Sequence, residues 1–437
     1  MQRTESNRGS RRFAQRRSPS GARGVAALAV TLLLFFALLL GVVFVHRNIV
    51  FEQRASANQY RSTQAFEAAE AGLAWAIAQL GTNRRIDSAC LPTDDAGATS
   101  FRERYLNYVA SSAGFTPATW SDAGVAQALQ PTCVRAPGGW ICGCPSAGRA
   151  TLIAPGTDVP APAFTIKFEA IAKPGLVRAV ATGCTSLGGA CAGDGGTATD
   201  ASARVETLIG LLPALRTAPA AALTVRGAVD ADAAAFGVHN RDAESGGLAI
   251  QAGGAVNTGH AHLTGPAGSS GAALIARDDA ALAGVGAGRL FASYFGLDKN
   301  AWARQPVVKR LGCNGSCGAA LLALIETEST AALIHVDGDL QIDGPAALGS
   351  TQRPVVVVVA GNVRLNGPVA VVGVLYAASV TWGGGAVPGA LLRGALLSEG
   401  DYRGDATPEI VYDTEVLARL KGSAGTFARV NGSWKDF

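Results

Sequence analysis

One feature constrains this chain more than any other: residues 25–45 (VAALAVTLLLFFALLLGVVFV) form an uncharged apolar run. As an α-helix, about 20 such residues span the hydrocarbon core of a membrane, which is roughly 30 Å thick. The preceding leader ends in Gly24 and carries Arg3, Arg8, Arg11, Arg12, Arg16, Arg17 and Arg23 against the single acid Glu5. Because basic flanks stay on the cytoplasmic side, this order predicts a single span with a cytoplasmic N-terminus and an exported remainder.

The small residue Gly24 precedes the apolar run instead of following it. A secretory signal has a shorter apolar core and is cut after it. Cleavage after Gly24 would leave the whole helix on a mature chain that begins at Val25, and the alternative is an uncleaved anchor with a basic tail. Apolar and small residues continue at helical spacing as far as Leu80, before Gly81. We therefore expect one helix over residues 25–80, transmembrane in its first half.

Three motifs resemble a known family. The junction RGVAAL (23–28), the stretch Glu52-Gln53-Arg54 and the run QAFEAAEAGL (64–73) are similar to the N-terminal region of type IV pilus minor pilins of the PilX family. The stretches HVDGDLQIDG, RPVVVVVAGNVRLNG and GTFARVNGSWKDF resemble, more loosely, the C-terminal regions of large PilX-like proteins.

The resemblance implies a defined processing and location. Residues 1–24 would be a prepilin leader, cleaved after Gly24 by a prepilin peptidase, and the new N-terminus Val25 would be methylated. The partners would be other minor and major pilins, the inner-membrane assembly platform and a tip adhesin. The chain would lie in the inner membrane before assembly and in the extracellular pilus afterwards.

One position departs from the pilin pattern. Most pilins carry glutamate as the fifth residue of the mature chain, and here that residue is Ala29. A buried carboxylate is costly without a cation, and in pilins the cation is the free amine of a neighbouring subunit. A subunit without the acid cannot neutralise a subunit ahead of it, and the extreme tip needs no such partner. Ala29 therefore predicts a tip or priming subunit; lineage drift is the alternative.

The exported part of the chain is close to neutral. The formal charge is +4, but the leader contributes 7 − 1 = +6, which leaves 30 basic and 32 acidic residues. No field strong enough for a nucleic-acid partner is expected.

Eight cysteines in an exported chain predict disulfides. Cys184 and Cys191 bracket a Gly-rich loop, and Cys313 and Cys317 bracket Asn-Gly-Ser, so both pairs look local. The other four would pair among themselves, in any of three connectivities; they are Cys90, Cys133, Cys142 and Cys144. The spacing of Cys142 and Cys144 does not suit a zinc knuckle.

The segments PAFTIKFEAIA, GLVRAVATG and ARVETLIGLL (203–212) predict antiparallel strands, with a turn at Lys173-Pro174-Gly175 between the first two. A long helix packed on such a sheet is the pilin architecture, so the fold class is α+β, with a pilin-like globular domain over residues 81–215. Residues 216–220 (RTAPA) read as a linker.

Residues 221–437 contain short apolar runs separated by Gly, Asp and Asn. Imperfect repeats of this kind predict a β-rich domain built as a parallel β-helix or a related stack, with helix within residues 287–330. The uncharged run PVVVVVA (354–360) predicts a buried strand that needs neighbours on both sides.

No catalytic constellation is recognisable, so we expect neither an enzyme nor a cofactor. His260 and His262 would share one strand face, but without an assured third ligand a solvated face is favoured over a metal site. Asp337, Asp339 and Asp343 lack the spacing of a calcium loop and are interpreted as turn residues, although calcium binding stays open. A turn also explains Arg403-Gly404-Asp405 better than an adhesion triplet, and the glycines at 284, 286 and 288 follow no predicted strand.

Together these patterns predict a minor pilin that takes part in type IV pilus assembly as a tip or priming-complex subunit, with its C-terminal domain displayed at the tip. One alternative is an adhesin in which residues 221–437 bind a surface or host ligand. Another is a tip-type pseudopilin of general secretion, which differs mainly in its genomic neighbours.

Overall fold

The computed structural model describes residues 23–109, 114–153, 156, 161–173, 175–191, 201–231, 236–386 and 388–436. The basic leader before Arg23, and Pro174 in the expected turn, lie outside the described residues. The chain divides into two compact units, Met1–Tyr60 and Arg61–Phe437.

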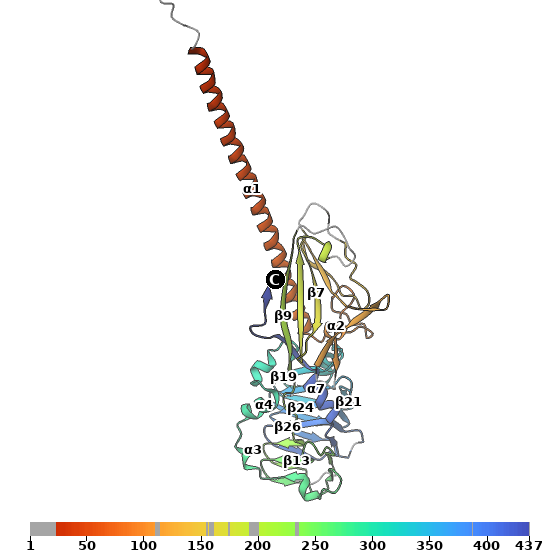
Figure 1. The fold of residues 1–437 in the computed structure, drawn as a ribbon. Coiled ribbons are helices and arrows are strands. Elements are labelled where there is room, and N and C mark those ends of the chain that lie inside the picture. The colour runs from red at the N-terminus through yellow and green to blue at the C-terminus, as the bar shows by residue number, and fades with distance from the viewer. Residues whose placement is uncertain are drawn as a thin grey trace, which may run out of the picture. The chain divides into compact units, whose positions relative to one another are not determined.

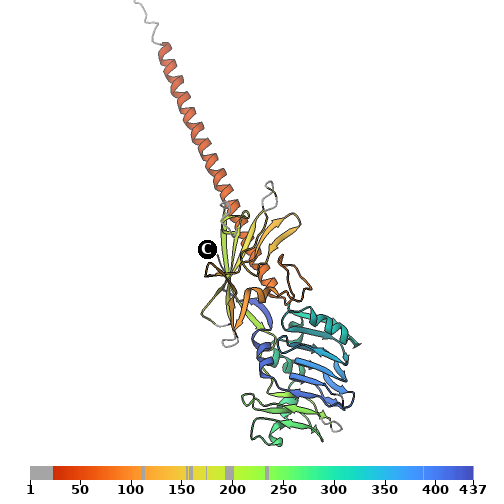
Figure 2. The same ribbon diagram turned by 90° about the vertical axis from the view of Figure 1, so that its right-hand side faces the viewer.

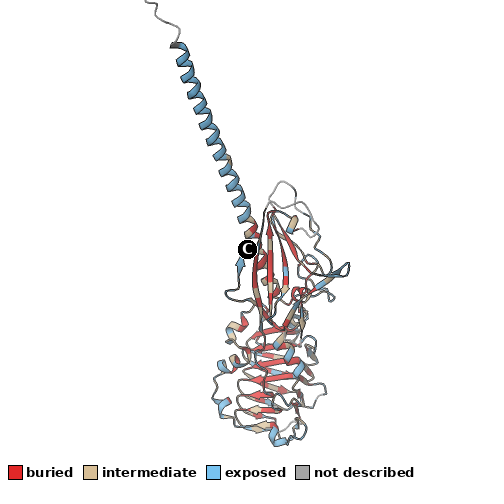
Figure 3. Cartoon of the chain, in the orientation of Figure 1, coloured by how far each residue is buried: buried red, intermediate tan, exposed pale blue. Residues whose placement is uncertain are grey.

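The first unit consists, in its described part, of the beginning of helix α1 (Arg23–Leu80). Its side chains are exposed throughout the apolar run, as the pale blue ribbon in Figure 3 shows. The helix ends at Leu80 and Gly81 follows it, which confirms the helix end predicted from the sequence.

In the second unit, the end of α1 packs on an antiparallel sheet whose strand order is β29-β9-β8-β7-β5-β6, with β30 also paired to β9 (Figure 1). These strands are β5 (Thr132–Ala136), β6 (Gly139–Gly143), β7 (Ala163–Ala170), β8 (Leu176–Cys184), β9 (Ser202–Pro213), β29 (Gly425–Arg429) and β30 (Lys435–Asp436). The strands expected at 162–172, 175–183 and 203–212 are β7, β8 and β9. We call residues 61–213 and 425–436 the helix–sheet region.

Smaller elements complete the helix–sheet region. They are α2 (Phe101–Tyr105), the hairpin of β1 (Leu106–Val109) and β2 (Gly114–Pro117), the hairpin of β3 (Thr119–Asp122) and β4 (Val125–Ala128), and the 3₁₀ turn Gly189–Cys191. Ser100 and Glu103 form a reciprocal capping box at the start of α2.

Small residues bring α1 close to the sheet. Ala65, Ala69 and Leu73 are fully buried on the helix side of the contact. On β8, a Cβ atom at Gly183 would lie 2.1 Å from the carbonyl oxygen of Ala65 and 2.3 Å from the amide nitrogen of Ala69. Helix and strand backbones therefore meet directly, which only glycine permits here.

The chain's last strands differ from the expectation that all of residues 221–437 form a separate β-rich domain. β29 and β30 return to the helix–sheet region and pair with β9. Trp434, the residue just before β30, also contacts α1: its ring packs against Phe66, and its Nε1 donates a hydrogen bond to Glu70. The β-rich segment is thus inserted between β9 and β29.

Residues 221–411 form a parallel β-solenoid, which confirms the stacked β-fold expected from the repeats (Figure 2). One face contains β10 (Ala221–Val225), β13 (Leu248–Ala252), β16 (Ile275–Ala276), β17 (Val308–Gly312), β19 (Ala332–Asp337), β22 (Val355–Val359), β24 (Val369–Ala377) and β26 (Leu391–Ser398). A second contains β11 (Val229–Asp230), β14 (Val256–Asn257), β18 (Gly315–Ser316), β20 (Leu340–Asp343), β23 (Asn362–Asn366), β25 (Ser379–Gly383) and β27 (Tyr402–Gly404). The third contains β12 (Gly237–His239), β15 (His262–Thr264), β21 (Ala346–Leu348) and β28 (Glu409–Val411), which pair with each other or with the first parts of β24 and β26.

The order of the strands in space differs from their order in sequence. The chain enters the solenoid in the middle, where β10 pairs with β26, and continues outward through β13 to β16. It then returns along the outside through α3 (Ala280–Gly284), α4 (Ala287–Phe295) and α5 (Lys299–Ala303) and resumes the stack at β17. In Figure 1 the green strands at the far end and the cyan strands near the helix–sheet region belong to these two parts of the stack.

The solenoid has an apolar interior and one covered outer face. Val355, Val357 and Val359 of β22 point into the interior core, to which Leu321 of α6 (Gly318–Glu326) also contributes. Val356 and Val358 point outward into a second core with α4, α5 and α7 (Thr414–Gly422). The buried strand predicted at PVVVVVA is therefore confirmed, with neighbours on both of its faces.

Candidate assembly segment and solenoid junction

The candidate assembly segment is the start of α1, where Gly24, Val25 and Ala29 lie in the first turns of the helix. The side chains of Val25 and Leu28 are 70% and 62% exposed, and the first turn contains no acidic residue. Among the described residues, one helix, Gly24–Leu80, is long and apolar enough to cross a membrane by length and composition.

This arrangement limits what can surround the segment. Exposing apolar surface to water costs roughly 25 cal/mol per Å². A continuous exposed apolar run therefore requires lipid or the apolar faces of other helices around it. No carboxylate lies within residues 25–45, so the segment itself brings no acid into such an environment.

The eight cysteines form four disulfides. Cys184 pairs with Cys191 and Cys313 with Cys317, the two local pairs expected. Of the three connectivities left open, the structure has Cys90–Cys144 and Cys133–Cys142. Cys90–Cys144 links the loop after α1 to the residue that follows β6, and Cys133–Cys142 joins paired positions of β5 and β6.

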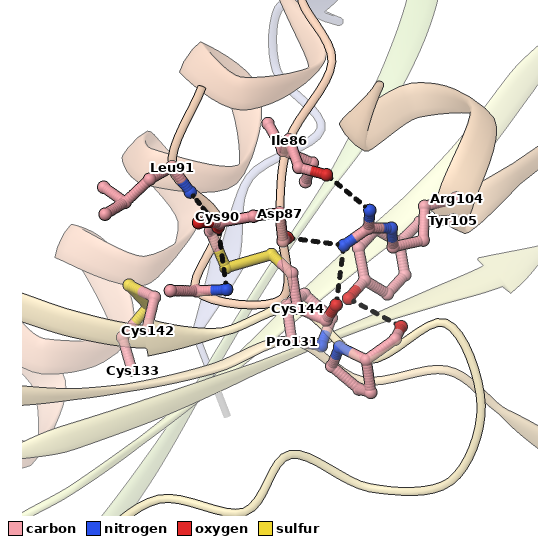
Figure 4. The surroundings of a disulfide bond; sticks show 12 residues. Ile86, Asp87, Cys90, Leu91, Arg104, Tyr105, Pro131, Cys133, Cys142 and Cys144 are labelled. Carbon is pink, nitrogen blue, oxygen red and sulfur yellow. Dashed lines mark hydrogen bonds between the residues drawn. A yellow bond between two sulfur atoms is a disulfide. The ribbon is translucent and has the colours of Figure 1, made fainter. Parts of the chain in front are cut away.

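Figure 4 shows how the Cys90–Cys144 disulfide is supported. The Arg104 guanidinium donates hydrogen bonds to the backbone carbonyls of Ile86, Asp87 and Cys144 at 2.6–2.7 Å. The Tyr105 hydroxyl donates to the carbonyl of Pro145. One arginine thereby satisfies carbonyl groups on both sides of the cross-link.

A second arginine joins the helix–sheet region to its returning strand. Arg102, only 4% exposed, donates hydrogen bonds to the carbonyl of Leu80 at the end of α1 and to that of Gly425 in β29. Its guanidinium also lies over the ring of Phe427. Burial lowers the pKa of Arg102 to about 10, so the group stays charged at neutral pH. The cation compensates the unpaired carbonyls at the C-terminus of α1.

Loop residues of the helix–sheet region bind the near end of the solenoid. Asn83, fully buried, donates a hydrogen bond from Nδ2 to the carbonyl of Ala331, and its own carbonyl accepts from the Ser329 amide. Arg85 donates to the carbonyl of Glu326. These contacts between distant parts of the sequence fix the solenoid at its β17 end.

Glu328 is a buried acid in this junction, 1% exposed. Burial raises the pKa of its carboxyl, and Lys309, whose Nζ lies 3.4 Å away, opposes the shift. A 310 Å³ hollow opens beside the junction, lined among others by Arg102, Tyr108 and Arg419.

The expected linker at 216–220 is not a free tether. Ala214 and Leu215, just before it, are fully buried, and the amide of Ala214 donates to the carbonyl of Ala424. The amides of Arg216 and Thr217 both donate to the carbonyl of Tyr294. Two adjacent chain crossings, near residues 214 and 424, therefore connect the solenoid to the helix–sheet region.

The remaining candidates from the sequence are spread over the solenoid. His262 is the exposed first residue of β15, but His260 lies in the turn before it, so the prediction that the two share one strand face is wrong. Asp337 and Asp339 flank Gly338 at a corner between two faces. Arg403 and Gly404 lie in strand β27, so the turn expected at Arg403-Gly404-Asp405 is wrong, and Arg403 pairs with Asp401. Within the part of the chain that the structure describes, no group of three or more His, Cys, Asp or Glu side chains could hold a metal ion.

The sequence analysis does not identify Arg102 and Arg104, because residues 82–162 are rich in turn-forming residues and show no clear periodicity. A signal existed: Ser100-Phe101-Arg102-Glu103 matches the Ser-x-x-Glu capping box and marks the start of a helix. It would have placed both arginines on α2, but not their carbonyl partners.

Comparison with known proteins supports the reading of the N-terminal segment. Residues 23–74 match the PilX N-terminal family, and no curated protein matches the chain. Among solved structures, the crystal structure of the competence-associated pilin ComZ from Thermus thermophilus matches at 14% identity, covering 86% of this chain and 98% of that chain, with a TM-score of 0.22. A TM-score that low does not show a common fold. The family match confirms the resemblance read from the sequence: residues 23–74 are similar to the PilX N-terminal region.

Proposed function

We propose that this minor pilin takes part in pilus assembly as a tip or priming-complex subunit, with its solenoid displayed at the tip. The observation that carries the proposal is Ala29, an exposed small residue where pilins place the glutamate that neutralises a neighbouring N-terminus. A carboxylate in an apolar bundle is tolerated only beside a cation. A subunit that has no such group fits the one position in a fibre with no subunit ahead of it.

Processing is the first step that the proposal requires. After cleavage behind Gly24, the chain would start at a methylated Val25 and keep its entire apolar helix. Mass spectrometry of the N-terminus, on protein from membranes and from sheared fibres, tests this with and without the prepilin peptidase. A methylated Val25 in the fibre fraction is expected. An intact Met1, or processed protein that never enters fibres, would contradict the proposal.

The tip position is tested by restoring the acid. Ala29→Glu would create a subunit that can neutralise another one ahead of it, so we expect labelled protein to appear along the shaft as well as at fibre ends. Ala29→Ser is the matched control, because it changes the same site without adding a charge. Immunogold labelling of sheared fibres measures the distribution. Unchanged tip labelling in the Ala29→Glu variant would remove the argument from the missing acid.

A second function, adhesion by the solenoid, is favoured by the insertion topology. Pro213 and Gly425 are paired residues of β9 and β29, and the Ala214 amide bonds to the Ala424 carbonyl. Residues 215–423 can therefore be replaced by Asn-Gly, a two-residue turn that joins antiparallel strands. The excised protein keeps α1, the sheet and the returning strands.

Two assays on cells that carry the excised protein, one for fibre assembly and one for surface attachment, separate the two functions. Normal fibres with lost attachment would assign the solenoid to binding. Loss of fibres, with the excised protein present in membranes at the normal level, would assign it to assembly. Circular dichroism of the purified variant shows whether the sheet has formed.

A further inference from the structure

The second face of the solenoid presents an uncovered polar trough. A hollow of 490 Å³ lies over the neighbouring strands β18, β20, β23 and β25. Its lining includes the polar residues Asn314, Asp339, Gln341, Asn362, Arg364, Ser379 and Thr381. This face contrasts with the outer face of β22, whose outward valines are covered by helices.

Strand register arranges these side chains in rows that cross the strands. Gln341, Arg364 and Thr381 are paired positions on β20, β23 and β25, so they form a central row. Asn362 and Ser379 are paired in the row beside it. Neighbouring strands are about 4.8 Å apart, and outward positions on one strand about 6.6 Å apart. The rows therefore run along the stack, on the scale of sugar rings in an extended chain.

The row beside the central one is held by internal hydrogen bonds. Asp339 accepts from the amide and the side chain of Asn362, and Asn362 in turn accepts from the Ser379 hydroxyl at 2.6 Å. These bonds fix one wall of the trough before any ligand arrives.

The row on the other side of the central one, outside the lining of the hollow, is also held by internal hydrogen bonds. Asp343 accepts from Asn366 at 2.7 Å and also from Ser316 and Gln341. Side chains on both sides of the central row are thus ordered in advance, which lowers the entropy cost of binding.

The central row keeps free donors. Within the described chain, the side chains of Arg364 and Thr381 form no hydrogen bond or ion pair, and Arg364 is exposed. A guanidinium offers five N–H donors in one plane, and a threonine hydroxyl both donates and accepts. The floor of the trough can therefore bind a ligand that presents many oxygen atoms.

The charge of the trough selects among such ligands. Its ionisable lining residues are Asp339 and Arg364, one of each sign. On the same face nearby, Arg403 of β27 is paired in register with Thr381 and forms an ion pair with Asp401, and Asp343 ends β20. Because charges of both signs lie close together there, a polyanion such as a nucleic acid gains little net attraction. Carboxylates and amides accept hydrogen bonds from hydroxyl groups, which neutral sugars supply.

We propose that this trough binds a neutral polysaccharide chain laid along the stack, across β20, β23 and β25, with Arg364 as the central donor. The proposed polysaccharide binding deepens the proposed function, and its role rests on the display of the solenoid at the pilus tip. The trough needs no residue of α1, so binding itself is independent of fibre assembly.

The test uses the full-length protein in detergent on an array of immobilised neutral and acidic oligosaccharides. We expect binding to neutral glycans that changes little between about 50 and 500 mM salt, because salt hardly screens hydrogen bonds to an uncharged ligand. Arg364→Ala should weaken binding to the best neutral oligosaccharide at least about tenfold, since it removes charge-assisted hydrogen bonds. Arg277→Ala is the matched control, because Arg277 is also exposed and lies outside the trough.

Several results would overturn the proposal. They are the absence of any neutral glycan bound by the wild-type protein, a preference for acidic polymers that disappears with salt, and equal losses in the two arginine variants. Thermal unfolding of Arg364→Ala at the wild-type temperature shows that a loss of binding is local. Sheared fibres from the same cells separate this proposal from the pilin function: fibres that contain the protein without glycan binding would refute only the trough.

Discussion

The helix–sheet region and the solenoid bury their strands in different ways. In β7, the fully buried Ile166 is followed by the exposed Lys167 and then by the buried Phe168, because α1 covers only one face of the antiparallel sheet. In β22, all five residues are buried, because the interior core lies on one side and helices α4, α5 and α7 on the other. A continuous apolar run therefore indicates a strand with two covers, and alternation a strand with one.

The two regions also differ in how they are cross-linked. Three disulfides lie in the helix–sheet region, and the longest, Cys90–Cys144, closes a separation of 54 residues. In the solenoid, Cys313–Cys317 closes a separation of four. Stacked rungs gain their order from strand pairing and side-chain rows, while residues 81–162, with one short helix and small hairpins, are also held by covalent links.

The largest effect is expected where helix and sheet backbones touch. Gly183→Ala would place a methyl group 2.1 Å from the Ala65 carbonyl oxygen, and neither backbone can move without breaking the sheet or the helix. We expect a loss of more than about 4 kcal/mol in the free energy of unfolding, or failure to fold. Denaturant unfolding of the detergent-solubilised protein, followed by circular dichroism, measures it.

Gly210→Ala provides the control on the neighbouring strand β9. There the one close contact of the new Cβ would be the flexible end of Leu176, at 2.7 Å, and the Gly175 carbonyl oxygen at 3.7 Å is at ordinary contact distance, so we expect a loss below about 1 kcal/mol. Equal stability of the two variants would show that α1 does not pack on β8 as closely as described.

The next effect compares the disulfides of the two regions. Cys90→Ser with Cys144→Ser should lower the free energy of unfolding by about 4 kcal/mol, and Cys313→Ser with Cys317→Ser by about 2 kcal/mol, since loop-closure entropy grows with the closed length. Melting curves of the two double variants under the same oxidising conditions give the order. The reverse order would mean that the solenoid, and not residues 81–162, depends on its cross-link.

The sequence predicted local structure well wherever one pattern had one physical cause. The apolar run, the end of α1 before Gly81 and the strands β7, β8 and β9 follow from periodicity and turn residues. The family match at residues 23–74 likewise rests on a contiguous motif. Such features depend on neighbours in sequence, so a single sequence suffices to predict them.

Long-range placement could not be predicted in the same way. Nothing in ALTVRGAVDADA states that β10 pairs with β26, more than 160 residues later, because parallel rungs with similar apolar patterns are interchangeable by pattern alone. The return of β29 to β9 is equally invisible, since GTFAR reads as one more short strand. The connectivity of Cys90 and Cys144 depends on the same unknown, which residues meet in space.

A smaller effect tests the two covers of β22 directly. Val358→Ala, on the outward face, should cost about 2 kcal/mol, close to the cost of Val357→Ala on the inward face, because both methyl pairs are lost from packed cores. Lys167→Ala, the outward position in β7, should cost less than about 1 kcal/mol, since it removes one half-exposed ion pair with Glu169. Urea unfolding of the three variants measures these losses. A loss for Val358→Ala as small as that for Lys167→Ala would mean that the helices do not cover this face.

The smallest effect is the pH dependence of stability that arises from the covered outer face of the solenoid. His335 is 5% exposed on β19, near Asp337, Arg310 and Lys299, and burial lowers its pKa. The folded protein then binds this proton less readily than the unfolded chain, so stability is complete above the unfolded pKa of about 6.5 and falls as the pH drops below it. The slope for one proton is at most about 1.4 kcal/mol per pH unit.

Glu328 has the opposite effect: burial raises the pKa of its carboxyl, so its contribution to stability increases on acidification. The informative quantity is therefore the difference in stability between the wild type and His335→Gln, measured from about pH 7.5 to about pH 5.5. We expect the variant to lose less stability across this range, and Asp337→Asn, which removes the carboxylate that favours the charged imidazole, to lose more. Parallel pH profiles for all three would show that His335 gains its proton as easily in the folded protein as in the unfolded chain, which is incompatible with a covered outer face at this end of β19.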